Sequence, residues 1–128
     1  MIPKHTEVTD PIAGRKSENC RAVSAVLARV GDKWTVLVIV LLGDGPKRFN
    51  EIKRMIDGIS QRMLTFTLRA LERDGLVTRT VYPTVPPRVD YELTDFGCLL
   101  REAVEPLLAW AKNHAVDIAD AQNTFDKK

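Results

Sequence analysis

The stretch from residue 60 to residue 88 constrains the fold most, because it predicts one helix followed by two strands. Ser60 is a favourable N-cap, since its hydroxyl can accept a hydrogen bond from an N–H group of the first helical turn. Leu64, Leu68 and Leu71 then form one apolar stripe at helical spacing. Gly75 follows where a glycine commonly ends a helix. We therefore expect a helix over residues 60–73 that buries one face.

The opposite face of this predicted helix is polar and cationic, with the side chains Gln61, Arg62, Thr65, Phe66 and Arg69 and no acidic residue. Two strands are expected next, from Leu76 to Tyr82 and from Val89 to Leu93. The loop between them contains three prolines and ends at Arg88, which we expect at the tip of the hairpin. A cationic helix followed by a basic-tipped hairpin is the arrangement that a winged helix-turn-helix uses to contact duplex DNA.

Helical patterns precede this stretch. A helix is expected from its N-cap Ser17 to Gly31, with the apolar stripe Val23, Val26, Leu27 and Val30. Asp32 caps a second helix that is apolar nearly all round, and we expect its inward residues to be Trp34, Leu37, Val38 and Leu41. Residues 47–49 predict a short strand that pairs with the hairpin. Residues 50–56 predict a short helix with Ile52, Met55 and Ile56 inward.

The turn Asp57-Gly58-Ile59 joins that short helix to the helix at residues 60–73, with the spacing of a helix-turn-helix. Gly58 is expected to adopt a positive φ there. After the hairpin, Thr94 caps a long helix that Pro106 should kink or divide. Cys98 is expected to be packed inside this helix, and residues 117–128 to fray. The predicted fold class is α+β, mainly α: a winged helix-turn-helix with N- and C-terminal dimerisation helices.

We expect a single domain, because the chain has 128 residues. Residues 1–16 are polar and aperiodic and predict a flexible N-terminal arm, residues 17–118 the winged-helix domain, and residues 119–128 a polar C-terminal tail. The N-terminus lacks an apolar signal segment, and the longest apolar run, residues 36–42, is too short to span a bilayer. A cytoplasmic protein without a membrane partner is therefore expected.

Charge is distributed unevenly along the chain although the net charge is only +2. Residues 46–90 contain nine lysines and arginines and five acidic residues, whereas the remainder contains ten basic and twelve acidic residues. This basic excess coincides with the predicted helix-turn-helix and hairpin, as in a nucleic-acid face, although a solvated charged surface would have the same composition. The two cysteines and two histidines show no metal-ligand spacing, and no nucleophile elbow or phosphate loop is present. We therefore expect neither an enzyme nor a cofactor or metal.

Several long motifs of the chain resemble the HxlR family of bacterial, MarR-like transcription regulators over roughly residues 20–113. The matching segments are Gly31-Asp32-Lys33-Trp34-Thr35, residues 45–51 (GPKRFNE), residues 58–65 (GISQRMLT), residues 71–77 (LERDGLV) and, most specifically, residues 82–91 (YPTVPPRVDY) followed by Leu93-Thr94. This resemblance implies a winged-helix homodimer that regulates transcription.

Two positions depart from the family pattern. Phe66 stands where the family usually has a polar residue, so this side chain either meets a thymine methyl group or packs locally. The family commonly begins its core with Cys-Pro, whereas this chain has Cys20-Arg21, and the distance from Cys20 to Trp34 is about one residue longer than usual. Some regulators of this family sense oxidants or quinones through a cysteine near this position, and the resemblance implies the same role for Cys20 through an altered motif.

The predicted DNA contacts follow from the geometry of B-DNA, whose major groove admits a helix. Ser60 caps the recognition helix, Gln61 is suited to adenine, Arg62 to guanine or a phosphate, and Thr65 to a thymine methyl group or a phosphate. Arg69 is expected at the backbone, and Arg88 in the minor groove beside the wing, residues 82–89. Lys47 and Arg48 would contact phosphates. The alternatives are a solvated helix face and, for Arg88, an ion pair with Asp90 or Glu92.

The apolar positions of the last helix are more numerous than one core stripe requires, which predicts a homodimer through residues 96–115 and the first helix. Such a dimer would bind an inverted-repeat operator. Cys20 lies in the first turn of a helix, where the positive end of the dipole favours a thiolate, so it is a candidate redox or electrophile sensor. A small molecule or an oxidant is then the expected signal. The alternative function is a winged-helix module for protein–protein contact that has no operator.

Overall fold

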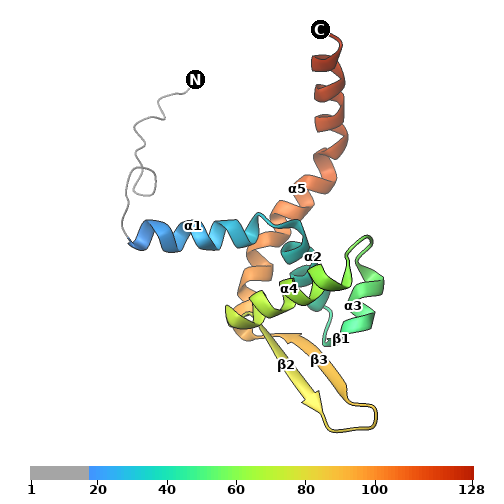
Figure 1. Cartoon of the computed structure of the whole chain (residues 1–128). Coiled ribbons are helices and arrows are strands. Elements are labelled where there is room, and N and C mark those ends of the chain that lie inside the picture. Colours follow the sequence, from blue (N-terminus) through green and yellow to red (C-terminus); the bar gives the residue numbers. More distant parts are fainter. Residues whose placement is uncertain (1–17) are drawn as a thin grey trace.

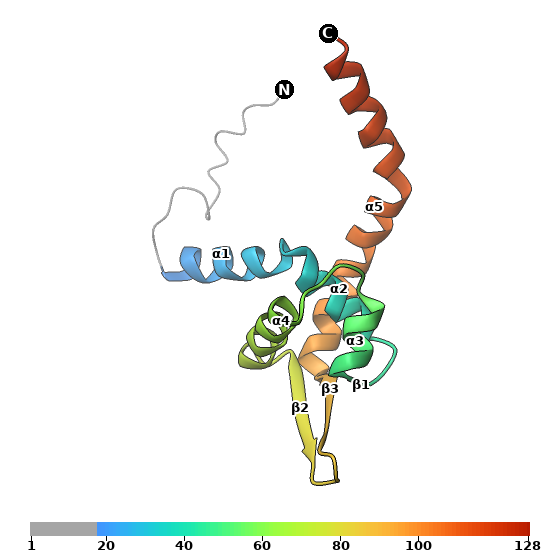
Figure 2. The same cartoon turned by 45° about the vertical axis from the view of Figure 1, so that its right-hand side comes forward.

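The computed structural model describes residues 18–128, and the predicted arm, residues 1–16, and the predicted cap Ser17 lie outside the described residues. The elements in chain order are α1 (Glu18–Val30), α2 (Lys33–Leu42), β1 (Lys47–Arg48), α3 (Phe49–Met55), α4 (Gln61–Arg73), β2 (Val77–Tyr82), β3 (Arg88–Leu93) and α5 (Asp95–Asp126). Helices α2, α3 and α4 and the hairpin form a body from which α1 and the distal half of α5 project (Figures 1 and 2).

The sheet is antiparallel, with the strand order β1-β3-β2. Strands β2 and β3 pair from Val77 with Leu93 to Tyr82 with Arg88, and β1 pairs Arg48 with Asp90. The predicted hairpin and the predicted short strand are therefore confirmed. Arg88 is the first residue of β3 and lies opposite Tyr82, so the prediction that it occupies the wing tip was wrong.

The core lies where α2, α3 and α4 meet the base of the hairpin and the first half of α5. Leu64, Leu68 and Leu71 of α4 are fully buried, as the stripe predicted. They belong to one cluster with Val38, Ile39, Leu42, Ile52, Ile56, Ile59, Leu76, Val77 and Val104. Burying aliphatic side chains of this size stabilises a fold by about 1.5–3 kcal/mol each, and here it fixes α4 with its polar face outward.

Two predicted core positions were wrong. Leu37 of α2 is 37% exposed and Met55 of α3 is 58% exposed. An almost wholly apolar helix such as α2 gives no periodic signal that selects its inward face. In the structure α2 buries Thr35 and Ile39, and Asp32 caps the helix by accepting hydrogen bonds from the Trp34 N–H at 3.4 Å and from the Thr35 hydroxyl at 3.0 Å.

The residues that cap the helices were predicted correctly. Ser60 accepts a hydrogen bond from the Met63 N–H at 3.0 Å, and Thr94 accepts one from the Gly97 N–H at 2.9 Å. Gly75 has φ +79°, and the N–H groups of Gly75 and Leu76 donate to the carbonyls of Glu72 and Leu71, which is a Schellman ending for α4. These caps place the start of α4 and the start of the hairpin.

Helix α5 is 32 residues long and continues to Asp126, so the prediction that residues 117–128 fray was wrong. Its second half contains five alanines between residues 109 and 121, and alanine has the highest helix propensity. Pro106 lies inside the helix, which bends along its length (Figures 1 and 2). Cys98 is exposed on α5 rather than packed, contrary to the prediction. No helix within residues 18–128 combines the length and apolarity needed to cross a membrane.

Candidate nucleic-acid interface

The outer face of α4 is presented by a helix-turn-helix made of α3, residues 56–60 and α4. Gly58 in the turn has φ +85°, as predicted. Since the leucine stripe is buried, the opposite face is solvent-accessible, and all five predicted side chains on it are exposed: Gln61, Arg62, Thr65, Phe66 and Arg69. The structure therefore brings these side chains together on one surface. Phe66 does not pack locally, because 65% of it is exposed.

Two further arginines border this surface, and the sequence did not indicate them. Arg29 from the last turn of α1 and Arg73 from the last turn of α4 line the same open groove as Gln61, Arg62 and Arg69. Arg73 lies four residues after Arg69, on the same face of α4, so it could have been predicted from the sequence. Arg29 was not, because it comes from a helix more than 30 residues earlier in the chain.

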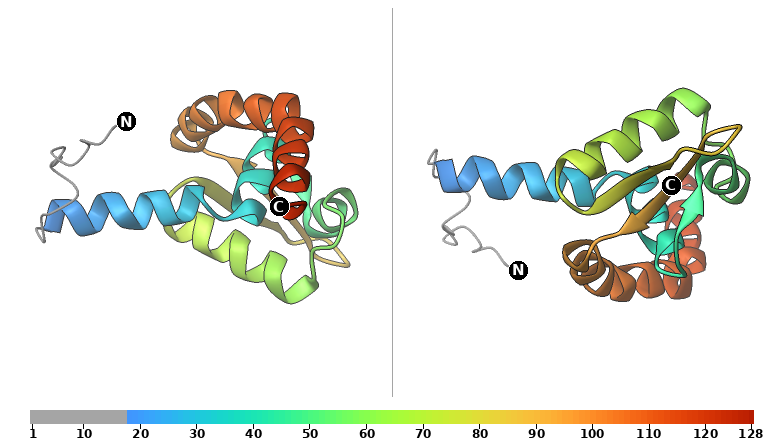
Figure 3. Two further views of the ribbon diagram at one scale, coloured as in Figure 1. Left: turned by 90° about the horizontal axis from the view of Figure 1, so that it is seen from above. Right: turned by 90° about the horizontal axis from the view of Figure 1, so that it is seen from below.

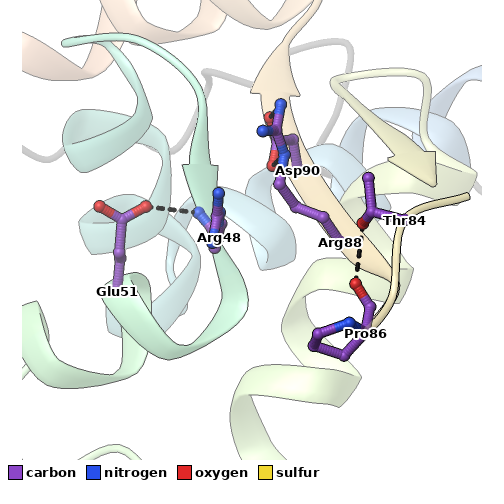
Figure 4. Close-up of polar contacts among 6 residues, drawn as sticks. All are labelled: Arg48, Glu51, Thr84, Pro86, Arg88 and Asp90. Carbon is purple, nitrogen blue, oxygen red and sulfur yellow. Dashed lines mark hydrogen bonds and ion pairs between the residues drawn. The ribbon is translucent and has the colours of Figure 1, made fainter. Parts of the chain in front are cut away.

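The wing is the loop between β2 and β3, and its apex is uncharged. Val85 is 99% exposed, and the Thr84 hydroxyl donates a hydrogen bond to the Pro86 carbonyl at 2.7 Å (Figure 4). Arg88 lies behind this apex. Its guanidinium is 4.3 Å from the centre of the Tyr82 ring, and its Nε and Nη2 atoms lie 3.3 Å from the two carboxylate oxygens of Asp90. Of the alternatives left open by the sequence, the ion pair with Asp90 is the one that the structure contains.

A second groove separates the wing from β1 and α3, and cations from both sides line it. They are Lys47, Arg48, Arg54 and Arg88, with Glu51 and Asp90 on the same surface. Glu51 accepts a hydrogen bond from the Arg48 N–H at 2.8 Å, which caps the start of α3 and leaves the exposed Arg48 side chain outside this hydrogen bond (Figure 4). Arg48 and Arg88 flank Asp90 on the sheet, because Arg48 is paired with Asp90.

An apolar groove lies between α1 and α5, and Arg29 lines both this groove and the one along α4. The groove between α1 and α5 has a volume of about 470 Å³. The residues that line it are Ala25, Val26, Arg29, Val30, Asp74, Leu76, Phe96, Leu99 and Leu100. Val26, Phe96 and Leu99 are each more than half exposed, which leaves a continuous apolar surface on the single chain. Cys20 is half-buried in the first turn of α1, the helix that forms one wall of this groove.

Within residues 18–128, no three histidine, cysteine or acidic side chains are grouped so that they could hold a metal ion. The polar side chains near α4 and the wing are mainly arginines, amides and hydroxyls. Such groups bind phosphates and base edges through hydrogen bonds and charge.

Comparison with known proteins agrees with this geometry. Residues 29–118 match the HxlR-like helix-turn-helix family. The uncharacterized HTH-type transcriptional regulator YtcD of Bacillus subtilis is 44% identical over 93 residues, which is 73% of this chain and 74% of that protein. YtfH from Salmonella typhimurium has a similar structure, with a TM-score of 0.74, 37% identity and coverage of 79% of this chain and 90% of that one.

The redox regulator HypR in its reduced form is also similar in structure, with a TM-score of 0.70, 42% identity and coverage of 78% of this chain and 98% of that one. The fold is thus that of winged-helix transcription regulators, and the proteins it resembles are regulators rather than enzymes. The chain is a DNA-binding transcription regulator of the helix-turn-helix type and belongs to the HxlR-like helix-turn-helix family.

Proposed function

We propose that the protein acts in the cytoplasm as a homodimer that binds an inverted-repeat operator, with α4 in the major groove and the wing at the minor groove. The observation that carries this proposal is the exposed face of α4, which presents an amide, two arginines, a hydroxyl and an aromatic ring from a capped and firmly packed helix. A rigid helix with such side chains suits the major groove, which is wide enough to admit it.

Each side chain of α4 is assigned a role by its position. Gln61 and Arg62 lie in the first turn, nearest the base edges, where Gln61 would pair with adenine and Arg62 would fork onto guanine. Thr65 and the exposed Phe66 would contact a thymine methyl group. Arg69, two turns along, would contact phosphates together with Lys47 and Arg48 at the margin. The ordered cap at Ser60 positions this first turn.

The wing would approach the minor groove with its uncharged apex and with Arg88 behind it. Asp90 and the Tyr82 ring hold the Arg88 guanidinium in one place, which lowers the entropy lost when it meets the DNA. On binding, the guanidinium would share its donors between Asp90 and the negative potential of the minor groove.

The proposed dimer uses the apolar groove between α1 and α5. Phe96 and Leu99 are large, apolar and exposed on the single chain, as are Val26 and Leu27 of α1. A second copy that covers these faces removes this apolar surface from water. With two-fold symmetry, two α4 helices would then face half-sites about one helical turn apart or a small multiple of it.

A selection experiment tests this function. DNA fragments retained by the purified protein from a random pool should share an inverted repeat, and binding should weaken steeply with salt as lysines and arginines release counterions from phosphates. A retained set without a shared sequence, bound with a salt slope near zero, would instead favour the alternative of a protein–protein module.

Regulation by oxidation is a second candidate property, favoured by the position of Cys20 in α1 and by the likeness to HypR, a redox regulator described in both reduced and oxidized forms. We propose that diamide joins the Cys20 thiols of two copies in a disulfide, taking up the two electrons and two protons that they lose. Such a bond would shift α1, and with it the separation of the two α4 helices.

The expected result is that diamide lowers operator affinity of the wild type and has no effect on Cys20→Ser. Because Cys98 is exposed, its thiol is accessible to the same reagent, and Cys98→Ser is the matched control. Cys98→Ser should respond like the wild type. An identical response of wild type and Cys20→Ser, measured by fluorescence anisotropy on a selected operator, would contradict the switch.

A further inference from the structure

An ion pair joins the end of α1 to the end of α4. The Nε atom of Arg29 lies 2.6 Å from the Oδ2 atom of Asp74, although the two residues are 45 positions apart in the chain. Asp74 is also the C-cap of α4, and its N–H donates to the Ala70 carbonyl at 3.0 Å. The carboxylate therefore belongs to the last turn of the proposed recognition helix, and the guanidinium to the last turn of α1.

Helix α1 is otherwise attached to the body near a single junction. It ends at Val30, Gly31 donates its N–H to the Leu27 carbonyl at 2.8 Å, and Asp32 then caps α2. Beyond this junction α1 extends away from the body (Figures 1 and 3), with Val26 and Leu27 exposed. This junction joins α1 to α2, and the Arg29–Asp74 pair adds a contact from the same end of α1 to α4, which restricts the direction of α1 relative to α4.

The direction of α1 matters if α1 forms part of the dimer interface. A helix of 13 residues is about 20 Å long, so a change of about 10° moves its far end by roughly 3.5 Å, close to the 3.4 Å rise of one base pair. A small error in the angle between α1 and α4 therefore places the second α4 helix about one base pair away from its half-site.

We propose that Arg29 and Asp74 are positioning residues that fix the angle between α1 and α4, and thereby set the half-site spacing that the dimer accepts. This inference rests on the proposed binding of a dimer to an inverted repeat. Both side chains are about one-third exposed, 31% for Arg29 and 32% for Asp74. Partly exposed pairs add little to folding stability, so the loss of this pair should leave the fold intact.

A spacing series measures this role. Wild type, Asp74→Asn and the reversed pair Arg29→Asp/Asp74→Arg are each titrated against operators whose two half-sites are moved by up to about two base pairs in either direction. We expect the wild type to prefer one spacing over its neighbours by about tenfold or more, since one mismatched base pair typically costs an affinity loss of this order. Asp74→Asn should reduce that preference to about threefold or less. The reversed pair should restore the preference.

Arg29 also borders the groove along α4, and a direct phosphate contact is the competing explanation for any effect of this pair. Asp74→Asn distinguishes a phosphate contact of Arg29 from a positioning role, because it leaves Arg29 in place and removes a negative charge beside it. A phosphate contact would then be strengthened equally at every spacing, whereas a positioning role flattens the spacing profile. An equal increase in affinity with an unchanged profile would overturn the inference.

Asp117→Asn is the matched control. It removes the carboxylate that lies 2.9 Å from the Nδ1 atom of His114, and Asp117 is a residue of α5 that follows the proposed dimer interface, residues 96–115, and has no part in the contact between α1 and α4. Its spacing profile should equal that of the wild type. If Asp74→Asn also keeps the wild-type profile, the inference is wrong while the proposed function stands. If the wild type itself is indifferent to spacing, the proposed dimer on an inverted repeat fails, and the inference fails with it.

Discussion

Arg62→Ala is expected to lower affinity for the selected operator by roughly 30-fold or more, because each lost fork onto guanine costs about 1–3 kcal/mol and both copies of a dimer carry the change. The side chain is exposed in the first turn of α4, so its removal leaves the core cluster of Leu64 and Leu68 untouched. The loss should be concentrated at one base pair in each half-site. There, discrimination between guanine and the other bases should largely disappear.

The measurement is a titration of single-base operator variants against wild type and Arg62→Ala, with Lys127→Ala as the control for a lost positive charge. Lys127 is exposed at the C-terminal end of α5, outside the proposed dimer interface at residues 96–115. It should bind every operator variant as the wild type does, to within about twofold, since distant surface charges are screened. A uniform weakening by Arg62→Ala at all base pairs would reassign Arg62 to a phosphate.

Leu99→Glu is expected to convert the dimer to monomers and to lower operator affinity by about 100-fold or more, because a carboxylate would have to be buried without a partner in the proposed interface. Leu99 is 61% exposed on the single chain, so the substitution should not unfold a monomer. Sedimentation equilibrium at micromolar concentration measures the oligomeric state, and circular dichroism checks the helix content.

Met55→Glu is the control for oligomeric state, since Met55 is similarly exposed, at 58%, but lies on α3 away from the groove between α1 and α5. It should sediment as the wild type does. A wild type that is already monomeric and still binds an inverted repeat tightly would rule out this interface.

The parts of the fold that sequence predicted well depend on local chemistry. The caps at Ser60, Asp32 and Thr94 and the positive φ of Gly75 follow from residues within a few positions of each helix end. The leucine stripe of α4 was equally readable, because one apolar face stands out against a polar one. These local features already determine which face of α4 is exposed.

The features that the sequence did not predict are of two kinds. Some depend on contacts between distant segments, and others lie on helices that have apolar residues on several faces. The inward face of α2 had no periodic signal, and the pair Arg29–Asp74 joins segments whose proximity only the fold creates. The side of α5 that carries Cys98 was misjudged because a helix with many apolar positions does not reveal which of them the single chain covers. The ion pair of Arg88 with Asp90 was predicted only as an alternative. It depends on where β3 begins, because Arg88 and Asp90 lie two residues apart on the same strand.

For the candidate site, the sequence was sufficient to bring together the exposed side chains of α4, because burial of the opposite stripe leaves them outside. The sequence did not predict which residues surround the exposed face of α4. Arg29 borders the same groove through tertiary structure, and the wing presents an uncharged apex with its arginine behind it. The proposed contacts therefore differ along the interface: base edges for the first turn of α4, phosphates for its end, and the minor groove for the wing.

A chemical footprint of the wild-type protein on its selected operator tests whether α4 reads the base sequence. Methylation interference at guanine N7 reports the major groove, and hydroxyl-radical cleavage reports backbone accessibility near the minor groove. We expect two major-groove patches related by two-fold symmetry, with centres about one helical turn or a small multiple of it apart, each flanked by a protected minor-groove segment. A single patch, or protection that is confined to the backbone and does not depend on sequence, would contradict the assignment of α4 as the helix that reads the operator.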